Sequence, residues 1–448
     1  MSQKRTLHAL RAALTLALAC AGLPAGAAQV AVVATVAADY TSAAHSLVTV
    51  DPVGGPRTAR NNLLATGISD ITVAAHGEHF YRIERFMGDN VAKFHVDAPE
   101  TVIWQFSSNG TGETASNPGD LVFADESQAY LLRYGADTAW IVDPSTTDEA
   151  GFKTGELDLS AYADADGLPE MAAAALVGDK LFVVLQRIDS TNNWTPGIAY
   201  VAVFDTTTTP IVEIETNTEA GDGLKGIPLP VKNPTAIQYQ ADTHTLYVQG
   251  VGRYAAPWSG TLAEYDGGIA SLDPDTYQTE MILDDGDAAD HPYGNIAGMA
   301  IVSANKGYFV GYAGWGDNTL YSLDLSTGTP TAIDGLSGKS IAGMEGGAYP
   351  DQNSMLWVCN ATDNRIEILN TATDIVDESV STGLNPFKVV FTGGSGVVAT
   401  ADEGGGSSGG LCFVANLAGS GVPGLGVGLV GLMVSALAAV GARVRRGR

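Results

Sequence analysis

The chain is poor in cysteine, with 3 in 448 residues. Cys20 lies in an apolar N-terminal segment, where lipid attachment is one alternative, and Cys359 and Cys412 remain for the rest of the chain. These two can form a disulfide only if the fold brings them together in an oxidising compartment, and spacing alone does not establish that. No cysteine pair has the short spacing of a zinc site, so a cysteine-based zinc module is excluded.

Basic residues are also scarce, with 23 Lys and Arg against 50 Asp and Glu and a net charge of −27. Seven of the basic residues lie in segments 1–28 and 443–448, which contain no acid. The part between them therefore keeps 16 basic residues against 50 acidic ones, a net charge of −34. Such a body repels nucleic acid and anionic lipid, so we expect no nucleic-acid partner. The acidity serves solubility, or it suits salty or calcium-rich surroundings.

Several motifs that mark enzymes are missing. The sequence has no H-E-x-x-H metalloprotease motif, no P-loop and no C-x-x-C-H haem-attachment motif. His76, His79 and His95 have the side chains of a metal site, but scattered structural histidines account for them more simply. Motifs alone therefore assign no catalytic residue.

What the chain does contain is a repeat, in which a short apolar strand runs into an acidic turn. The residues that close the strand are Asp51, Asp97, Asp143, Asp205, Asp273, Asp324 and Asn370, at intervals of 46, 46, 62, 68, 51 and 46 residues. Periods near 40 to 50 residues with short strands are typical of β-propeller blades. Asp and Asn accept hydrogen bonds from backbone N–H groups just downstream, so we interpret these residues as turn formers.

Each unit also carries an earlier strand that is apolar on both faces, as in residues 181–185 and 246–249. A blade is covered by a neighbour on each side, which explains this pattern. Trp104, Trp140 and Trp357 lie in predicted strands and are expected in the core. We predict an all-β fold, a seven-bladed β-propeller over residues 29–403, with six or eight blades as the nearest alternatives. Strands from both termini should complete one blade.

The unit at 353–370, N-S-M-L-W-V-C-N-A-T-D-N-R-I-E-I-L-N, is followed by G-L-N-P-F-K-V at 383–389. It resembles the Tyr-Val-Thr-Asn type of surface-layer propeller repeat. The resemblance implies a seven-bladed, secreted and non-enzymatic protein.

The N-terminus predicts export. Lys4, Arg5 and Arg11 precede an apolar run at 12–21, and small residues follow up to position 28. This is the pattern of a secretory signal peptide over residues 1–28.

The C-terminus predicts a membrane segment. A Gly/Ser-rich linker with a sorting motif covers 404–421, an uncharged apolar stretch covers 422–442, and a basic tail covers 443–448. About 20 apolar residues span a bilayer as a transmembrane helix, and the trailing arginines favour a cytoplasmic end.

This arrangement resembles the three-part C-terminal sorting signals of Gram-negative bacteria. The resemblance implies a membrane peptidase as a partner, with Gly409, Gly410 and Cys412 as recognition residues and the body released to the cell surface. Permanent anchoring through the helix stays open. Either way we expect an exported protein, on the outer surface of a bacterium or anchored in a membrane and facing the periplasm or extracellular space.

A candidate ligand-binding surface lies in the polar loops that hold Trp194, Trp258 and Trp315. These loops join the second and third strands of consecutive blades, so they should share one face, with Tyr254 nearby. Exposed aromatic residues of this kind suit sugar rings or a cationic or hydrophobic partner, here an extracellular polymer or protein. The alternative is that each tryptophan only covers its own loop.

A link between blades on the same face carries Asp284, Asp285, Asp287 and Asp290. Carboxylates in such a group could bind calcium, which prefers six to eight oxygen ligands. Solvated loop acids are the alternative.

The sequence therefore favours a non-catalytic binding or scaffold module at the cell surface. Two alternatives stay open. The first is an exported propeller enzyme, lactonase-like or quinone-dependent dehydrogenase-like, whose scattered residues would escape motif searches. The second is a structural component of a surface layer.

Overall fold

The computed structural model describes residues 29–50, 56–216, 221–257, 259–346 and 355–392. The predicted signal peptide, linker with sorting motif, membrane helix and basic tail lie outside these ranges. Within them, no helix is both long and apolar enough to cross a membrane.

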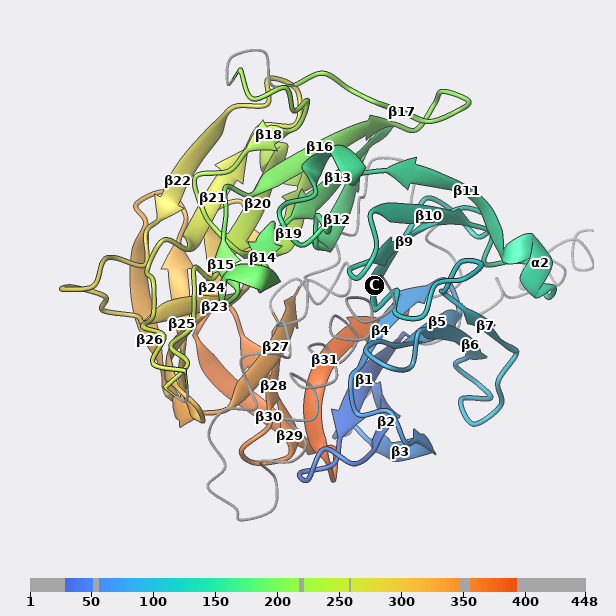
Figure 1. The fold of residues 1–448 in the computed structure, drawn as a ribbon. Helices are drawn as coiled ribbons and strands as arrows, with labels where there is room; N and C mark the ends of the chain where they lie inside the picture. The colour runs from blue at the N-terminus through green and yellow to red at the C-terminus, as the bar shows by residue number, and fades with distance from the viewer. Residues whose placement is uncertain (1–28, 51–55, 217–220, 258, 347–354, 393–448) are drawn as a thin grey trace, which may run out of the picture.

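Apart from one small two-stranded sheet, the strands of the described residues form seven antiparallel sheets around a common axis, so the fold is a seven-bladed β-propeller (Figure 1). From the innermost strand outward, blade 1 consists of β31 (Asn385–Phe391), β1 (Val30–Val36), β2 (Ala43–Thr49) and β3 (Ala59–Thr66). Blade 2 consists of β4 (Ile71–His76), β5 (His79–Glu84), β6 (Asn90–His95) and β7 (Trp104–Ser107). Blade 3 consists of β8 (Pro118–Phe123), β9 (Ala129–Arg133), β10 (Thr138–Val142) and β11 (Lys153–Asp158).

The remaining four blades continue around the ring in chain order. Blade 4 consists of β12 (Met171–Val177), β13 (Lys180–Leu185), β16 (Tyr200–Asp205) and β17 (Val212–Glu213), and β18 (Ile227–Pro228) also pairs with β16. Blade 5 consists of β19 (Pro234–Gln240), β20 (Thr245–Gly250), β21 (Gly268–Leu272) and β22 (Thr279–Leu283), and blade 6 of β23 (Asn295–Ser303), β24 (Lys306–Gly314), β25 (Asp317–Asp324) and β26 (Thr329–Lys339). Blade 7 consists of β27 (Ile341–Gly346), β28 (Met355–Asn360), β29 (Arg365–Asn370) and β30 (Ile375–Ser381).

The two ends of the described chain close the ring in blade 1. Strand β1 pairs with β2 on one side and with β31 on the other, and the first and last strands lie side by side in Figure 1. The N–H of Val30 donates to Oγ1 of Thr392 over 3.1 Å, and the N–H of Thr392 donates to the carbonyl oxygen of Val30 over 2.9 Å. Strands from both ends of the described chain thus complete one blade, as predicted, with β1 beside β2.

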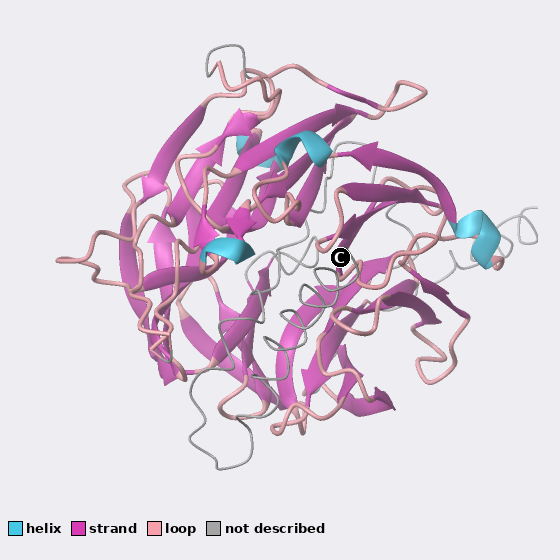
Figure 2. Ribbon diagram, in the orientation of Figure 1, coloured by secondary structure: helices cyan, strands magenta, loops and turns pink. Residues whose placement is uncertain are grey.

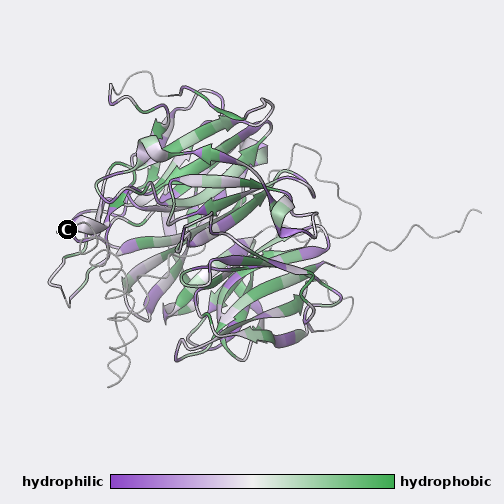
Figure 3. Cartoon of the chain, turned by 45° about the vertical axis from the view of Figure 1, so that its right-hand side comes forward, coloured by the Kyte–Doolittle hydropathy of each residue, from purple (hydrophilic) through white to green (hydrophobic). Residues whose placement is uncertain are grey.

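The core consists of apolar clusters between neighbouring blades. In β13, Leu181 and Val183 pack into the cluster shared with blade 3, while Phe182 and Val184 pack into the cluster shared with blade 5. This confirms why the second strands are apolar on both faces. Figure 3 shows that hydrophobic residues are concentrated in the strands and hydrophilic residues in the turns. The predicted core tryptophans Trp104, Trp140 and Trp357 are buried.

The acidic residues that close the third strands are turn formers, as predicted. Oδ1 of Asp324 accepts hydrogen bonds from the N–H of Ser326 over 2.8 Å and from its hydroxyl over 2.6 Å. Side-chain oxygens accept from downstream N–H groups in the same way at Asp143, Asp205, Asp273 and Asn370. Asp97 differs, because its own N–H donates to Nδ1 of His95. Asp51 lies outside the described residues.

Helix is nearly absent, as Figure 2 shows, and α2 (Glu149–Phe152) is the one α-helix in the described part of the chain. The polar stretch at 147–170 contains the outer strand β11. Outer strands face water on one side and carry polar residues, so their sequence resembles that of a loop. In blade 4 the outer strand is divided into β17 and β18, which bracket a long insertion.

Candidate ligand-binding face

Two kinds of loop emerge together at one end of the propeller. Because neighbouring strands are antiparallel, the loops from second to third strands lie at the same end as the links from one blade to the next. We call this end the link face. Trp194, Tyr254, Trp315 and the link that contains Asp285 all belong to it.

Residues 163–170, here called the acid loop, link blade 3 to blade 4. The loop ends in Glu170, whose side chain is buried, with 2% of the residue exposed. Oε2 of Glu170 accepts a hydrogen bond from the N–H of Ile188 over 3.0 Å. Burial raises the pKa of this carboxyl to about 9, and repulsion from Asp166 and Asp164 adds to the effect. Glu170 is therefore neutral at pH 7.

The acid loop supports the hairpin of β14 (Ile188–Asp189) and β15 (Thr195–Pro196), here called the blade-4 hairpin. Oδ2 of Asp166 accepts hydrogen bonds from Ser190, over 3.1 Å from the N–H and 2.6 Å from the hydroxyl. Oδ1 of Asp189 accepts from the N–H of Thr191 over 2.9 Å. The carboxylates of this region thus hold the hairpin in shape.

Four residues of this region have a left-handed backbone conformation, as do others elsewhere in the chain. Glu170, Arg187, Asn193 and Trp194 have φ of +47°, +53°, +57° and +55°, in the left-handed region that glycine prefers. A non-glycine residue in the left-handed conformation costs on the order of 1–3 kcal/mol. Such residues persist where the surrounding structure enforces the conformation, often at binding sites. Trp194 is also 39% exposed, so its ring does not repay the strain through complete burial.

A second hairpin, in blade 5, leans on the first. It runs between the paired residues Arg253 and Glu264, with a further bridge between Ala256 and Thr261. Nδ2 of Asn193 donates to Oγ1 of Thr261 over 2.7 Å, and Nη1 of Arg253 donates to Oγ1 of Thr195 over 3.1 Å. The two hairpins therefore form one continuous support.

Three large apolar side chains are exposed on the two hairpins or, for Ile198, two residues beyond the end of β15. They are Trp194, Ile198 and Leu262, with exposed fractions of 39%, 56% and 79%, and we call them the apolar patch. Sequence reasoning found Trp194 but missed Ile198 and Leu262. In the sequence, each of these two residues is only a single aliphatic side chain in a polar loop. That pattern indicates an exposed surface only when the two hairpins are known to lie together.

The other predicted aromatic residues continue the surface toward blade 6. The ring of Tyr254 packs against Tyr312 of β24, with centroids 4.6 Å apart and the planes at 63°. Trp315 is half-buried in the turn between β24 and β25. Trp258 lies outside the described residues. The structure thus connects Trp194 to the blade-5 hairpin and Tyr254 to blade 6.

The predicted calcium ligands occupy the link between blades 5 and 6. Oδ1 of Asp284 accepts from the N–H of Gly286 over 2.9 Å, and Oδ1 of Asp287 accepts from the N–H of Asp290 over 2.9 Å. These acids therefore shape their own turns. In the ranges that the structure describes, no group of three or more His, Cys, Asp or Glu side chains is arranged to hold a metal ion.

Asp285 differs from its neighbours because it is completely buried. Its Oδ1 accepts from the N–H of Gly267 over 3.1 Å, while its Oδ2 has no hydrogen-bond partner among the described residues. Burial, with repulsion from Asp284, raises the pKa of this carboxyl to about 7. Calcium at this link stays a prediction.

The histidines singled out from sequence form one cross-strand row at the opposite end of blade 2. His79 pairs with His76 on one side and with His95 on the other. The rings of His79 and His95 meet edge to face with centroids 5.2 Å apart, and His76 stacks on Phe123. Packing accounts for these positions.

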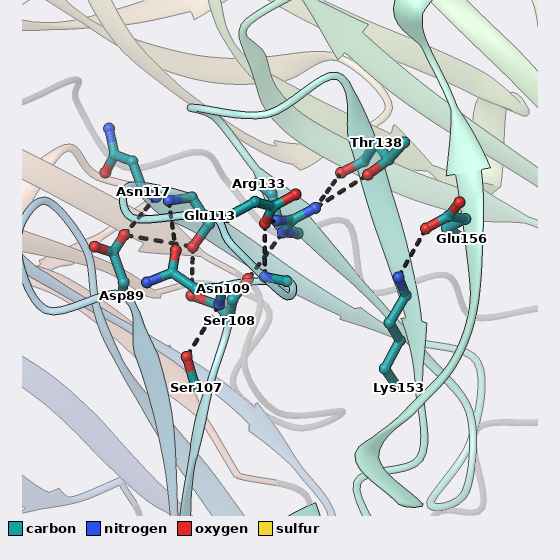
Figure 4. Close-up of polar contacts among 12 residues, drawn as sticks. Asp89, Ser107, Ser108, Asn109, Glu113, Asn117, Arg133, Thr138, Lys153 and Glu156 are labelled. Atoms are coloured by element: carbon teal, nitrogen blue, oxygen red, sulfur yellow. Dashed lines mark hydrogen bonds and ion pairs between the residues drawn. The ribbon is translucent and has the colours of Figure 1, made fainter. Parts of the chain in front are cut away.

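A polar network between blades 2 and 3 shows what a purely structural part of the link face looks like (Figure 4). The buried guanidinium of Arg133 donates to the carbonyl oxygen of Ser108 over 2.9 Å and to Oγ1 of Thr138 over 3.0 Å, and it pairs with Glu113. It also stacks 4.3 Å from the ring of Trp140. The donors of Arg133 are therefore used by partners within the protein.

Comparison with known proteins agrees with the fold. No family model and no curated protein matches the chain. A Bacteroides uniformis protein named as a candidate 6-phosphogluconolactonase aligns over 81% of this chain and 99% of its own, with 12% identity and a TM-score of 0.54. A Bacteroides fragilis protein of the same description aligns over 82% and 98%, with 13% identity and a TM-score of 0.51. At such identities, the chain is similar to these proteins in its β-propeller fold alone.

Proposed function

We propose that the chain is an exported, non-catalytic β-propeller that binds an extracellular ligand or partner protein through the apolar patch on its link face. The observation that carries this proposal is Trp194. A large aromatic side chain is held in a strained backbone conformation and left partly in water. A partly exposed aromatic ring on a fixed backbone is the kind of anchor that binding surfaces use.

The rigidity of the two hairpins supports the proposal. Because Asn193 and Thr195 are tied to the blade-5 hairpin, the patch is largely ordered before a ligand arrives. Less conformational entropy is then lost on binding. Loops on a rigid scaffold are the usual place for such residues.

Export is supported by the two termini. The signal-peptide pattern at 1–28 and the apolar segment at 422–442 would send the propeller out of the cytoplasm and tether it. The strongly acidic body then remains soluble outside the cell. Gly409, Gly410 and Cys412 would serve the sorting peptidase in this scheme.

An exported hydrolase of the lactonase kind is the second candidate. Glu170 favours it, since a buried carboxyl with a strongly raised pKa is a common form of general acid. The names of the two Bacteroides propellers point the same way. Against it, a phosphorylated lactone needs cationic groups, and the nearby Arg187 and Arg253 are committed to internal hydrogen bonds.

The test is binding of the purified chain to the isolated envelope of the bacterium that produces it. Trp194→Ala and Leu262→Ser should each weaken binding at least about tenfold, because interface residues of this kind contribute more than about 1.4 kcal/mol. Ile375→Ser is the matched control, since Ile375 lies in blade 7 and is 61% exposed. Equal binding by all variants would contradict the proposal.

The hydrolase alternative needs its own measurement. Release of acid from a panel of sugar lactones should be absent for the native chain if the binding proposal is right. Turnover that disappears in Glu170→Gln would instead establish the enzyme. An absorbance spectrum of the native protein with a quinone band would favour the dehydrogenase alternative.

A further inference from the structure

The surroundings of the apolar patch are acidic. Asp164 and Asp166 lie on the acid loop, and Asp166 binds Ser190 of the blade-4 hairpin. Asp189 lies on that hairpin and pairs with Thr195, the residue that follows Trp194. Burial raises the pKa of Asp164, with Asp166 and Asp189 contributing repulsion. The repulsion among these carboxyl groups indicates that they lie close together.

Three basic residues of this region already have partners within the protein. Nε of Arg187 donates to the carbonyl oxygen of Tyr162 over 2.9 Å, and its guanidinium lies 5.3 Å from the ring of Tyr200. Arg253 pairs with Glu264, and Lys232 pairs with Asp266 over 2.6 Å. Because each of these cations is already paired within the protein, the carboxylates nearby favour a positively charged ligand.

The polar groups beside Trp194 are also poorly placed for a sugar. A carbohydrate site needs hydrogen-bonding side chains that are free to meet hydroxyl groups. Here Asp166 already accepts a hydrogen bond from the N–H of Ser190, and Asp189 accepts one from the N–H of Thr191. The remaining exposed groups at the patch, Ile198 and Leu262, are aliphatic and suit a protein side chain better than a sugar ring.

We infer that the apolar patch binds a segment of a partner protein in which Lys or Arg lies beside an apolar side chain. This inference rests on the proposed function and names its partner class. The apolar side chain packs against Leu262 and Ile198. The cation lies over the face of Trp194, where cation–π attraction and the neighbouring carboxylates act in the same direction.

The experiment uses three synthetic peptides of equal length as probes. One alternates Lys with Leu, one alternates Glu with Leu, and one alternates Lys with Ser. Binding to the full chain is measured by titration calorimetry at two salt concentrations. The Lys–Leu peptide should bind best by at least about tenfold, and its affinity should fall as salt rises, because exposed charges are screened.

Variants locate the contact. Trp194→Ala and Leu262→Ser should weaken Lys–Leu binding about tenfold or more, while Ile375→Ser leaves it unchanged. Asp164→Asn keeps the oxygen that accepts from the N–H of Asp166 but removes the charge, so it should weaken binding a few-fold. Since Leu262 is 79% exposed, its replacement should not unfold the chain, and a thermal unfolding curve checks this.

Equal binding of the Glu–Leu peptide, or Lys–Leu binding that survives in the double variant Trp194→Ala/Leu262→Ser, would overturn the inference. Binding of the Lys–Ser peptide as tight as that of Lys–Leu would also overturn it, since charge alone would then suffice. If the Lys–Leu peptide does not bind while binding to the envelope still depends on Trp194 and Leu262, the partner class is wrong and the proposed function stands. Loss of that dependence overturns both.

Discussion

Asn193 donates a hydrogen bond from Nδ2 to Oγ1 of Thr261, 2.7 Å away, and this contact joins loops of two neighbouring blades. The two residues are 68 positions apart in the chain. The contact lies directly beside Trp194 and Leu262, so it sets the spacing of two members of the apolar patch. The rigidity of the patch therefore depends on a contact between blades.

The strained backbone at Trp194 predicts that a substitution there can preserve the free energy of unfolding while it weakens binding. Trp194→Gly relieves the left-handed conformation, so the free energy of unfolding should stay the same or rise by up to about 1 kcal/mol. Affinity for the envelope should nevertheless fall at least about tenfold. Urea unfolding and the binding assay measure the two effects. A variant that loses stability and keeps its affinity would show that the ring serves packing.

Asp324 predicts how the repeated turns respond to substitution and pH. Asp324→Ala removes the acceptor for Ser326 and should lower the Tm by roughly 1–3 °C, whereas Asp334→Ala on the exposed side of β26 should not. Hydrogen bonds from the Ser326 hydroxyl and N–H lower the pKa of the Asp324 carboxyl. Its stabilising contribution is therefore present above pH 3.8 and is lost as the pH falls through the lower folded value. The gap between wild type and Asp324→Ala should close in acid.

Glu170 predicts a pH dependence of opposite sign. Its pKa rises from the ordinary 4.5 to about 9 in the fold, so the folded chain holds this proton more tightly than the unfolded chain. The contribution is fully present below pH 4.5 and is lost as the pH rises toward 9, by at most about 1.4 kcal/mol per pH unit. Glu170→Gln cannot ionise but can still accept from Ile188.

Denaturant midpoints at pH 5, 7 and 9 check this prediction. The Glu170→Gln variant should lose less stability than the wild type between pH 5 and 9. Glu280→Gln, at an exposed position of β22, is the control and should follow the wild-type profile. Parallel profiles for Glu170→Gln and the wild type would show that the buried carboxyl does not control stability.

Replacing Arg133, at the boundary of blades 2 and 3, should lower the free energy of unfolding strongly. Arg133→Met leaves the carbonyl oxygen of Ser108 and the side chain of Thr138 without their buried donor, and should cost about 3 kcal/mol. Arg60→Met is the matched control, because Arg60 and Glu100 form an exposed ion pair at 3.7 Å. Its effect should stay below about 1 kcal/mol. Similar losses in the two variants, measured by urea unfolding, would contradict the structural role of Arg133.

The repeat was predictable from sequence because its signals are local. An apolar run and an acidic turn each act within a few residues, so the second strands and the turn at Asp324 were found where the structure has them. Strand β11 was missed because an outer strand exposes one face and carries Lys, Thr and Glu. Its composition is then that of a loop.

The site was only partly predictable, because it is assembled from distant loops. The tryptophan in the blade-4 hairpin could be assigned to the correct face from the repeat alone. The participation of Leu262 depends on how blade 5 leans on blade 4. The burial of Asp285 depends on Gly267 across the blade, and no local signal separates it from Asp284 or Asp287.

Thiol protection on the bound protein tests the central claim, that the apolar patch meets the ligand. In a background of Cys412→Ser, single thiols are introduced by Leu262→Cys and, as a control, by Ile375→Cys. Native Cys359 is buried and its pKa is raised, so it should react little. With the protein bound to the envelope, a maleimide should label Ile375→Cys fully and Leu262→Cys at least about tenfold more slowly than in the free protein. Equal labelling of Leu262→Cys in the bound and free states would contradict the account.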